Sequence, residues 1–253
     1  MLALVTAFFA TALLYASVGF AGGSTYNALL VLAGVDQKIF PIIALACNLI
    51  VATGGSIRFA RAGLVPWRRL WPLLAVSVPA AWVGGALPVS KTLFILLLGI
   101  SLFCAGVLLL FQRPLREDGA GEVPRFRIIG PLIAAPLGLL SGIVGIGGGI
   151  FLAPVLHLIG WDRTKRISAS ASVFILANSI AGLGGQLSKI TDGGMAVLQP
   201  VVAYWPLAMA VLIGGQIGSR AGVTILPPIG VRRLTAVLIL YVSIRLLWQS
   251  FSS

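Results

Sequence analysis

The sequence predicts an all-α polytopic membrane protein built from two inverted-topology repeats. Three observations lead to this fold class: the composition, a glycine-broken helix pattern that occurs twice, and basic loops that alternate between the two halves. Each repeat is expected to contain four spanning helices and one glycine-broken re-entrant half helix.

The composition disfavours most classes of soluble protein. Of the 253 residues, 58% are hydrophobic and only 9% are charged, and the mean hydropathy is +1.05. A soluble domain carries about 25% charged residues, so this chain is poorly suited to cover its own surface in water. Soluble enzymes, nucleic-acid-binding domains and disordered chains are therefore disfavoured. The net charge of +12 comes from basic residues between apolar runs, where such residues orient a chain against a membrane.

Apolar runs of roughly the length of a bilayer span, which needs about 17–25 residues, recur along the chain. They cover residues 2–18, 39–57, 70–87, 92–111, 128–144, 167–187, 198–217 and 234–248. Two further apolar pieces, Ser24–Gly34 and Ile150–Gly160, are shorter. Eleven helical residues reach about 16 Å, or half of the hydrocarbon core. Each short piece follows a full span through a glycine cluster, which predicts a re-entrant half helix.

The two halves of the chain align as an internal repeat. An offset of 126 superposes five positions of the first half on five of the second: Gly19, Gly22, Gly23, Gly34 and Asp36 fall on Gly145, Gly148, Gly149, Gly160 and Asp162. After a four-residue insertion, an offset of 130 superposes Asn48 on Asn178. The predicted units are a first transmembrane repeat over 1–111, a cytoplasmic linker over 112–127 and a second transmembrane repeat over 128–253.

The basic residues predict that equivalent loops lie on opposite sides of the membrane. The loop after the second span is rich in arginine, with Arg58, Arg61, Arg68 and Arg69, whereas its counterpart at 188–197 has only Lys189. The loop after the first half helix has Lys38, whereas its counterpart has Arg163, Lys165 and Arg166. Because basic loops favour the cytoplasm, the N- and C-termini are both predicted outside. This alternation is the condition for inverted repeats, a common transporter architecture.

The starts of the two half helices form the candidate site. Each start has unpaired backbone N–H groups and the positive end of a helix dipole, and glycine lets a ligand approach the backbone closely. Such a start favours an anion, especially a tetrahedral oxyanion. The candidate binding residues here are Gly22, Gly23, Ser24, Thr25, Gly147, Gly148 and Gly149. In the alternative interpretation, these glycines only allow close helix packing.

Other polar residues within the predicted spans extend this candidate site. Asn48 and Asn178 lie in the middle of equivalent spans, where a buried amide needs a hydrogen-bond partner. They either line the central cavity or hold neighbouring helices together. Ser170 precedes Asn178 by eight residues, on roughly the same helix face. Gln216 is expected either in the cavity or against a neighbouring helix. His157 is either a proton carrier or, as its distance from Gly149 favours, a packed neutral side chain.

The sequence indicates no catalytic centre. All six acidic residues lie in predicted loops. Near the glycine clusters there is no embedded carboxylate pair, metal-ligand cluster or Ser–His arrangement. No catalytic residue, metal site or cofactor is therefore predicted, and an intramembrane enzyme is disfavoured.

Three segments resemble the sulfite exporter TauE/SafE family of membrane transporters. They are GIVGIGGGIFLAPVLHLIG, SASASVFILANSIAG and, more weakly, GFAGGSTYNALLVLAG. The resemblance covers nearly the whole chain and implies an inner-membrane transporter of sulfite, organosulfonates or related small anions. It matches Gly147, Gly148, Gly149 and Asn178 directly, and Gly22, Gly23 and Asn48 through the repeat. Ala21 and Ala28 depart from the second copy, which has Gly147 and Pro154.

The function expected is secondary transport of small sulfur-containing anions across the inner (plasma) membrane by alternating access. A passive anion channel of the same fold is the alternative. The expected partners are the anion and the lipid bilayer, with no nucleic acid. The exact substrate, the direction of transport, a proton or sodium as coupling ion, and the oligomeric state are left open by the sequence.

Overall fold

The protein is all-helical throughout the part of the chain that the computed structural model describes, which is residues 1–17, 19–36, 38–111, 126–190, 198–224 and 228–251. The predicted all-α class is confirmed. The helices are α1 Leu2–Ser17, α2 Gly23–Leu32, α3 Phe40–Arg61, α4 Trp67–Ala86, α5 Lys91–Phe111, α6 Phe126–Val144, α7 Gly149–Leu158, α8 Thr164–Ser188, α9 Gln199–Val202, α10 Trp205–Thr224 and α11 Pro228–Phe251.

The predicted run at 198–217 is divided in the structure. It forms the short α9 and the longer α10, which begins at Trp205 and continues to Thr224. Pro206 is the second residue of α10, where proline fits because the N–H groups of the first turn have no partner within the helix. Residues 112–125 of the predicted linker and residues 191–197 of the predicted loop lie outside the described residues.

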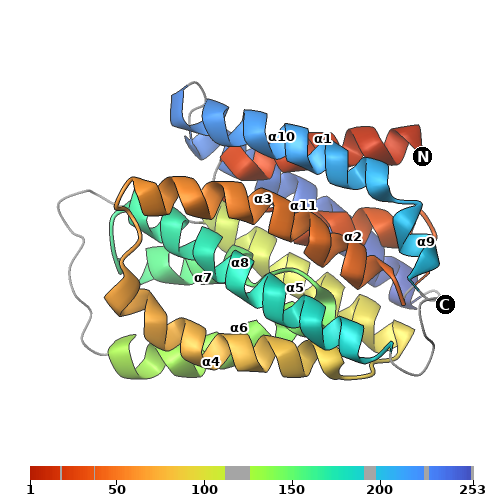
Figure 1. Cartoon of the computed structure of the whole chain (residues 1–253), viewed down its shortest axis with the longest axis horizontal. Helices are drawn as coiled ribbons and strands as arrows, with labels where there is room; N and C mark the ends of the chain where they lie inside the picture. Colours follow the sequence, from red (N-terminus) through yellow and green to blue (C-terminus); the bar gives the residue numbers. More distant parts are fainter. Residues whose placement is uncertain (18, 37, 112–125, 191–197, 225–227, 252–253) are drawn as a thin grey trace.

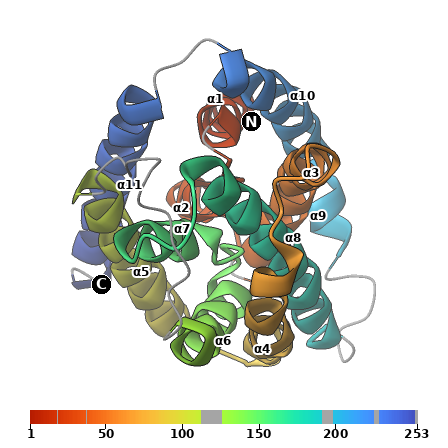
Figure 2. The same cartoon turned by 90° about the vertical axis from the view of Figure 1, so that its left-hand side faces the viewer.

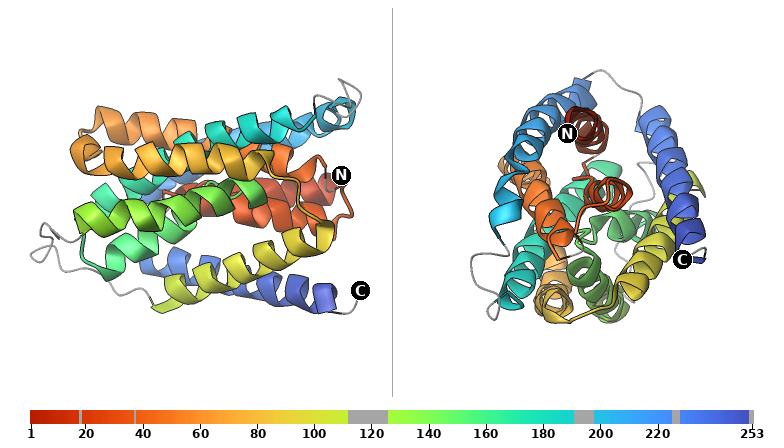
Figure 3. Two further views of the ribbon diagram at one scale, coloured as in Figure 1. Left: turned by 90° about the horizontal axis from the view of Figure 1, so that it is seen from below. Right: turned by 90° about the vertical axis from the view of Figure 1, so that its right-hand side faces the viewer.

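The half helices α2 and α7 lie inside the bundle. In Figure 1 the long helices run along the horizontal axis, with α7 toward the left and α2 toward the right. The view along that axis in Figure 2 shows both half helices within a surround that includes α11, α5, α6, α4, α3 and α10. The two chain termini lie at the same end of the bundle, as the left view of Figure 3 shows.

Glycines bring several long helices into close contact. A Cβ built on Gly142 of α6 would fall against the carbonyl oxygen of Ala81 in α4, and one on Gly85 of α4 against that of Gly182 in α8. On the other side of the molecule, a Cβ on Gly218 of α10 would fall against the carbonyl oxygen of Leu13 in α1. Small residues at these contacts are typical of membrane helix pairs. These glycines therefore serve packing.

The exposed surface fits a lipid environment. Among the described helices, α3, α5 and α8 combine the length and the apolarity that a bilayer crossing needs. Large apolar side chains are exposed on the outside, and the exposed tryptophans are Trp67, Trp71, Trp82, Trp205 and Trp248. Extensive exposed apolar surface is unfavourable in water and favourable in lipid. The structure is that of a helical membrane protein.

Candidate functional site

The first helix break lies between α1 and α2. Gly22 is the N-cap of α2 and has φ = 88°, in the left-handed region that favours glycine. Its carbonyl accepts the first hydrogen bond of the helix, from Tyr26 N at 3.0 Å. A Cβ at Gly22 would lie 3.0 Å from Thr11 Cγ2 and 3.0 Å from Tyr26 Cζ. Both the left-handed backbone and the close neighbours therefore require glycine at position 22. Because glycine has no side chain, it leaves the first N–H groups of α2 without a side-chain cap.

The second break, between α6 and α7, contains more left-handed residues. Gly145, Gly147 and Gly148 have φ values of 75°, 81° and 73°. Gly148 is the N-cap of α7, in the same role as Gly22 in α2. A Cβ on Gly147 would lie 2.8 Å from Ile175 Cγ2 and 3.0 Å from Ser179 Oγ. The half helix again begins with backbone N–H groups and no side-chain cap.

Two asparagines of the first half connect the breaks. Asn27, in α2, donates from Nδ2 to the carbonyl oxygens of Val144 at 2.7 Å and Gly145 at 3.2 Å. Asn48, in α3, donates from Nδ2 to the same Gly145 oxygen at 3.5 Å. The Asn48 amide also lies directly over Gly23, where a Cβ would collide with it. The predicted residues Gly23, Asn48 and Gly147 are therefore neighbours, and the two breaks meet in one buried region.

This region holds polar atoms that the protein leaves without partners. The hydroxyl oxygens of Tyr26, Ser141 and Ser179 and the amide oxygens of Asn27 and Asn48 are buried and have no hydrogen-bond partner among the described residues. Ser179 Oγ lies at the Gly147 position, and a Cβ on Gly148 would lie 3.4 Å from Ser141 Cβ. Buried polar groups are normally hydrogen-bonded, so such a cluster requires water or a ligand.

The remaining predicted site residues are arranged differently. Thr25 Oγ1 pairs with the hydroxyl of Tyr15 at 2.7 Å, and Ser24 is buried in the first turn of α2. Asn178 and Ser170 are buried in α8 and donate to carbonyl oxygens of their own helix, those of Phe174 and Arg166, at 2.8 Å each. Gly149 packs against Ile175 and the carbonyl of Ala171. Neither Asn178 nor Ser170 makes the contact between breaks that Asn48 makes.

Gln216 and His157, for which the sequence allows two roles each, lie away from the breaks. Gln216 Nε2 would be 3.0 Å from a Cβ on Gly54, so this side chain faces the neighbouring helix α3. His157 is buried in the last turn of α7, at the far end of that helix from Gly149.

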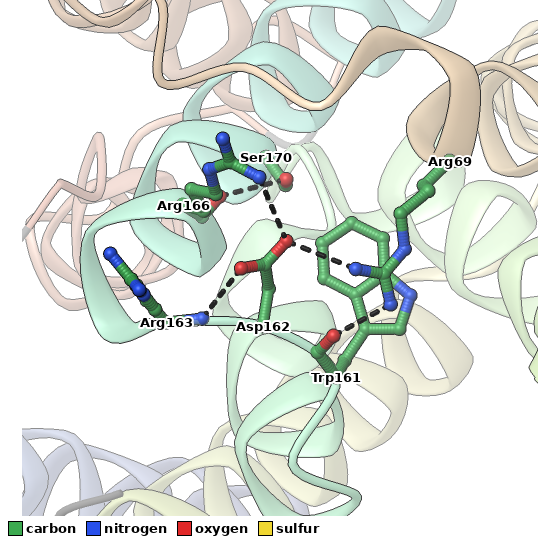
Figure 4. Close-up of polar contacts among 6 residues, drawn as sticks. All are labelled: Arg69, Trp161, Asp162, Arg163, Arg166 and Ser170. Carbon is green, nitrogen blue, oxygen red and sulfur yellow. Dashed lines mark hydrogen bonds and ion pairs between the residues drawn. The ribbon is translucent and has the colours of Figure 1, made fainter. Parts of the chain in front are cut away.

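A charged cluster lies where the α7–α8 loop meets the start of α4 (Figure 4). Arg69 pairs with Asp162 at 3.0 Å, donates to the carbonyl of Trp161 at 2.6 Å and stacks on the Trp161 ring at 4.4 Å. Arg166 approaches the same carboxylate at 3.7 Å. The Asp162 side chain is only 8% exposed. One carboxylate faces two guanidinium groups here, so the cluster keeps a net positive charge, and the Arg69–Asp162 pair joins the start of α4 to the α7–α8 loop.

Neither break has the ligands that metal catalysis requires. Among the described residues, no group of three or more His, Cys, Asp or Glu side chains is close enough to hold a metal ion. The polar groups at the breaks are backbone N–H, amide and hydroxyl groups. These groups bind by hydrogen bonds and dipoles.

Sequence reasoning missed Asn27, Ser141 and Ser179. Asn27 occupies a polar position in a half helix, four residues after Gly23 and thus on the same face. Ser141 precedes the second glycine cluster by four residues, and Ser179 adjoins the predicted Asn178. A search for every polar residue within one helical turn of the glycine clusters and their neighbouring asparagines finds all three.

Comparison with known proteins gives the family. The family model described as sulfite exporter TauE/SafE matches residues 3–246. The probable membrane transporter protein y4hK of Sinorhizobium fredii is 31% identical over 97% of each chain. A probable membrane transporter protein of Xylella fastidiosa is 26% identical over 93% of each chain. The probable membrane transporter protein MamO of Magnetospirillum gryphiswaldense is 25% identical over 83% of this chain and 38% of its own.

No solved structure shows significant similarity to this chain. The family match extends over nearly all of the sequence and includes both helix breaks and the intervening helices. The protein therefore belongs to the sulfite exporter TauE/SafE family of membrane transporters.

Proposed function

We propose that this protein is a secondary transporter of small sulfur-containing anions such as sulfite or sulfonates. The anion is held where the starts of α2 and α7 meet, near the bilayer midplane. The observation that carries the proposal is the convergence of two glycine-capped helix starts on Asn48, which contacts Gly23 and reaches Gly145 and Gly147. Membership of a transporter family and the buried position of both breaks support it.

The electrostatics of the breaks favour an anion. Each helix start carries about half a positive charge from its macrodipole, and the effect is strongest where water is excluded. The breaks contain no Lys or Arg in residues 19–25 or 145–151. The attraction comes from dipoles and N–H groups, which allows the anion to be released as well as bound. A transporter requires both.

Hydroxyl groups complete the proposed binding site. Tyr26, Ser141 and Ser179 have buried oxygens without partners among the described residues, and a hydroxyl can donate to a sulfur oxyanion. Gly22, Gly23 and Ser24 supply backbone N–H groups from α2, and Gly148 and Gly149 supply them at α7. Asn178 and Ser170 remain predictions for this site, because their donors are used within α8.

The helix pairings support two inverted repeats. Under the offsets of the sequence repeat, α1 to α5 correspond to α6, α7, α8, α10 and α11. The contacts of α4 with α6, α2 with α3 and α5 with α7 have counterparts in those of α10 with α1, α7 with α8 and α11 with α2. Half helices that enter from opposite ends fit this relation (Figure 1). Rocking of one repeat against the other would expose the anion alternately.

The proposed orientation places the arginine-flanked connection between α3 and α4 in the cytoplasm and both termini outside the inner membrane. Arg69, in the first turn of α4, contacts Asp162, so this connection and the basic α7–α8 segment lie at one end of the bundle. Reporter fusions at residues 63 and 253 test this orientation. We expect a cytoplasmic signal at 63 and a periplasmic signal at 253. The same signal at both sites would contradict the inverted arrangement.

Ligand-dependent stability tests the function. The purified protein is heated with sulfite, thiosulfate, sulfoacetate, taurine or sulfate, because a bound ligand raises the melting temperature by mass action. We expect at least one sulfur oxyanion to stabilise the protein in a saturable manner. Counterflow of that anion in liposomes then supports a carrier, whereas non-saturating current supports a channel. No response to any of these anions would contradict the proposed site.

A further inference from the structure

We propose that a small monovalent cation binds at the amide oxygens of Asn27 and Asn48, beside the break between α6 and α7. This inference rests on the proposed anion transport and supplies its coupling ion. It is carried by the orientation of the two amides and by the unmet acceptors that this orientation creates.

The orientation of each amide is set by a carbonyl group. Asn27 Nδ2 is 2.7 Å from the Val144 oxygen and 3.2 Å from the Gly145 oxygen, and Asn48 Nδ2 is 3.5 Å from the same Gly145 oxygen. A flip of the Asn27 amide would set two oxygens against each other at 2.7 Å. The NH₂ groups therefore face the break and the Oδ1 atoms face away from these carbonyls.

The two Oδ1 atoms are buried acceptors. Both asparagines are 0% exposed, and neither Oδ1 has a donor among the residues that the structure describes. An amide oxygen cannot donate, so a fully deprotonated anion such as SO₃²⁻ cannot satisfy it. The missing partner must carry positive charge or donate hydrogen bonds. Leaving two such oxygens unpaired would be costly at this depth.

The chemistry of the site selects a monovalent ion. Hard cations bind amide and carbonyl oxygens, and carbonyl groups of unwound helices are typical ligands of coupling ions in transporters. No carboxylate takes part, because the acidic residues of the chain lie at 36, 117, 118, 122, 162 and 192, outside the breaks. A divalent ion would lose its hydration without a compensating charge.

The position of Asn48 links this cation to the anion. The Asn48 amide lies against Gly23, the first residue of α2, and its Nδ2 would be 3.4 Å from a Cβ on Gly147. Asn48 Oδ1 would lie 2.7 Å from a Cβ on Gly23, so this acceptor oxygen adjoins the start of α2. Opposite charges at this separation in a low dielectric stabilise each other strongly. Each ion should therefore raise the affinity for the other.

The experiment compares cations with and without the anion. Purified wild-type protein is heated in NaCl, KCl or N-methyl-D-glucamine chloride at equal ionic strength, and sulfite, as its N-methyl-D-glucamine salt, is titrated in each. We expect Na⁺ to raise the melting temperature relative to N-methyl-D-glucamine. We expect Na⁺ to lower the apparent Kd for sulfite about 5–150-fold, the usual range for coupled sites.

Variants then locate the cation. Asn27→Ala and Asn48→Ala are expected to lose the Na⁺ dependence of both readouts. Gln186→Ala is the matched control, because Gln186 Nε2 also donates to a carbonyl of α6, that of Gly142 at 2.9 Å, from a buried position in α8. This control is expected to lose some stability and keep the Na⁺ effect. The wild-type comparison decides the matter even if an asparagine variant fails to fold.

The outcomes separate this inference from the proposed function. Sulfite binding of equal strength in all three salts would overturn the cation site and leave the anion site intact. An Na⁺ effect that survives in both asparagine variants would also overturn it, in favour of ordered water at these oxygens. A melting shift with Na⁺ alone and no sulfite response in any salt would support the cation site and contradict the anion site.

Discussion

The two helix breaks share a cap and differ in their surroundings. Gly22 and Gly148 hold the same left-handed conformation at the start of a ten-residue half helix. At the first break Tyr15 bonds to Thr25 and Tyr26 stacks on Phe8, and a Cβ on Gly19 would lie 3.0 Å from Ser168 Cβ of the other half. The carbonyls of the second break are held by asparagines of the opposite half. Both breaks thus contact the opposite half, and the second is the one whose carbonyls accept hydrogen bonds from it among the described residues.

The same difference explains the unequal glycine patterns. Gly147 has φ = 81°, and a Cβ there would crowd its neighbours. Its counterpart Ala21 is not left-handed, because the left-handed residues described in the first break are Gly19 and Gly22. The second break needs a third left-handed residue between α6 and α7, and the first does not. The departure at Ala21 is thus a real difference in backbone path between the two copies.

The largest expected effect comes from alanine at the N-caps. Gly22→Ala and Gly148→Ala each force a left-handed alanine, at a cost of about 1–2 kcal/mol, and add crowding worth about 1–3 kcal/mol. Sulfite-dependent stabilisation should be lost in both variants, because the helix starts move. Thermal unfolding with and without sulfite measures both effects.

Gly34 and Gly160 provide the controls for these variants. They end the same two half helices with φ values of 72° and 61°, and a Cβ on either would meet no atom within 4 Å. Gly34→Ala and Gly160→Ala should lower the free energy of unfolding only by the cost of a left-handed alanine, about 1–2 kcal/mol. Both variants should retain the sulfite response. Equal loss of the response in all four variants would mean that the breaks have no special role.

A smaller effect distinguishes two amides. That of Asn27 bonds to carbonyls of the other half, whereas that of Asn178 bonds within α8. Asn27→Ala leaves two carbonyls of the second break without their buried donor, which should cost about 1–3 kcal/mol. Asn178→Ala removes a bond to Phe174 O, which the α8 backbone still satisfies, and should cost about 0.5–1 kcal/mol. Unfolding in detergent compares the two. A larger cost for Asn178→Ala would argue against the link between the halves.

The smallest expected difference concerns the equivalent aspartates Asp162 and Asp36. Asp162 is 8% exposed and pairs with Arg69, whereas Asp36 accepts only the exposed backbone N–H of Lys38 at 3.0 Å among the described residues. Asp162→Asn should lower stability by about 1–2 kcal/mol, since Arg69 is itself 27% exposed. Asp36→Asn should cost less than about 0.5 kcal/mol. Equal melting temperatures for the two variants would show that the Arg69 contact is not stabilising.

Much of the fold could be predicted because apolar run length and glycine position act locally. The two half helices were expected over Ser24–Gly34 and Ile150–Gly160 and form over Gly23–Leu32 and Gly149–Leu158. The division near Pro206 was not expected, because hydropathy alone does not register a break between two apolar segments. The prolines and the short connection between α9 and α10 determine it.

The site is less predictable from the sequence, because an internal repeat points only to residues that match between the halves. Asn27 aligns with Ala153, so the repeat comparison concealed it, although it makes the shortest hydrogen bond to the second break. Asn48 and Asn178 match in sequence, yet Asn48 reaches the breaks and Asn178 bonds within α8. Helix rotation and neighbours in space decide that difference, and neither is visible in a residue pattern.

In the proposed mechanism, one anion site forms where α2 and α7 begin. Selenite, a heavier analogue of sulfite with the same pyramidal shape, locates that site by its anomalous signal in an experimental structure. We predict a single strong selenium peak, placed so that the oxygens bonded to it reach the backbone N–H groups of Gly23 or Ser24 and of Gly149 or Ile150. A peak at the Arg69–Asp162 cluster, with none at the breaks, would contradict the account.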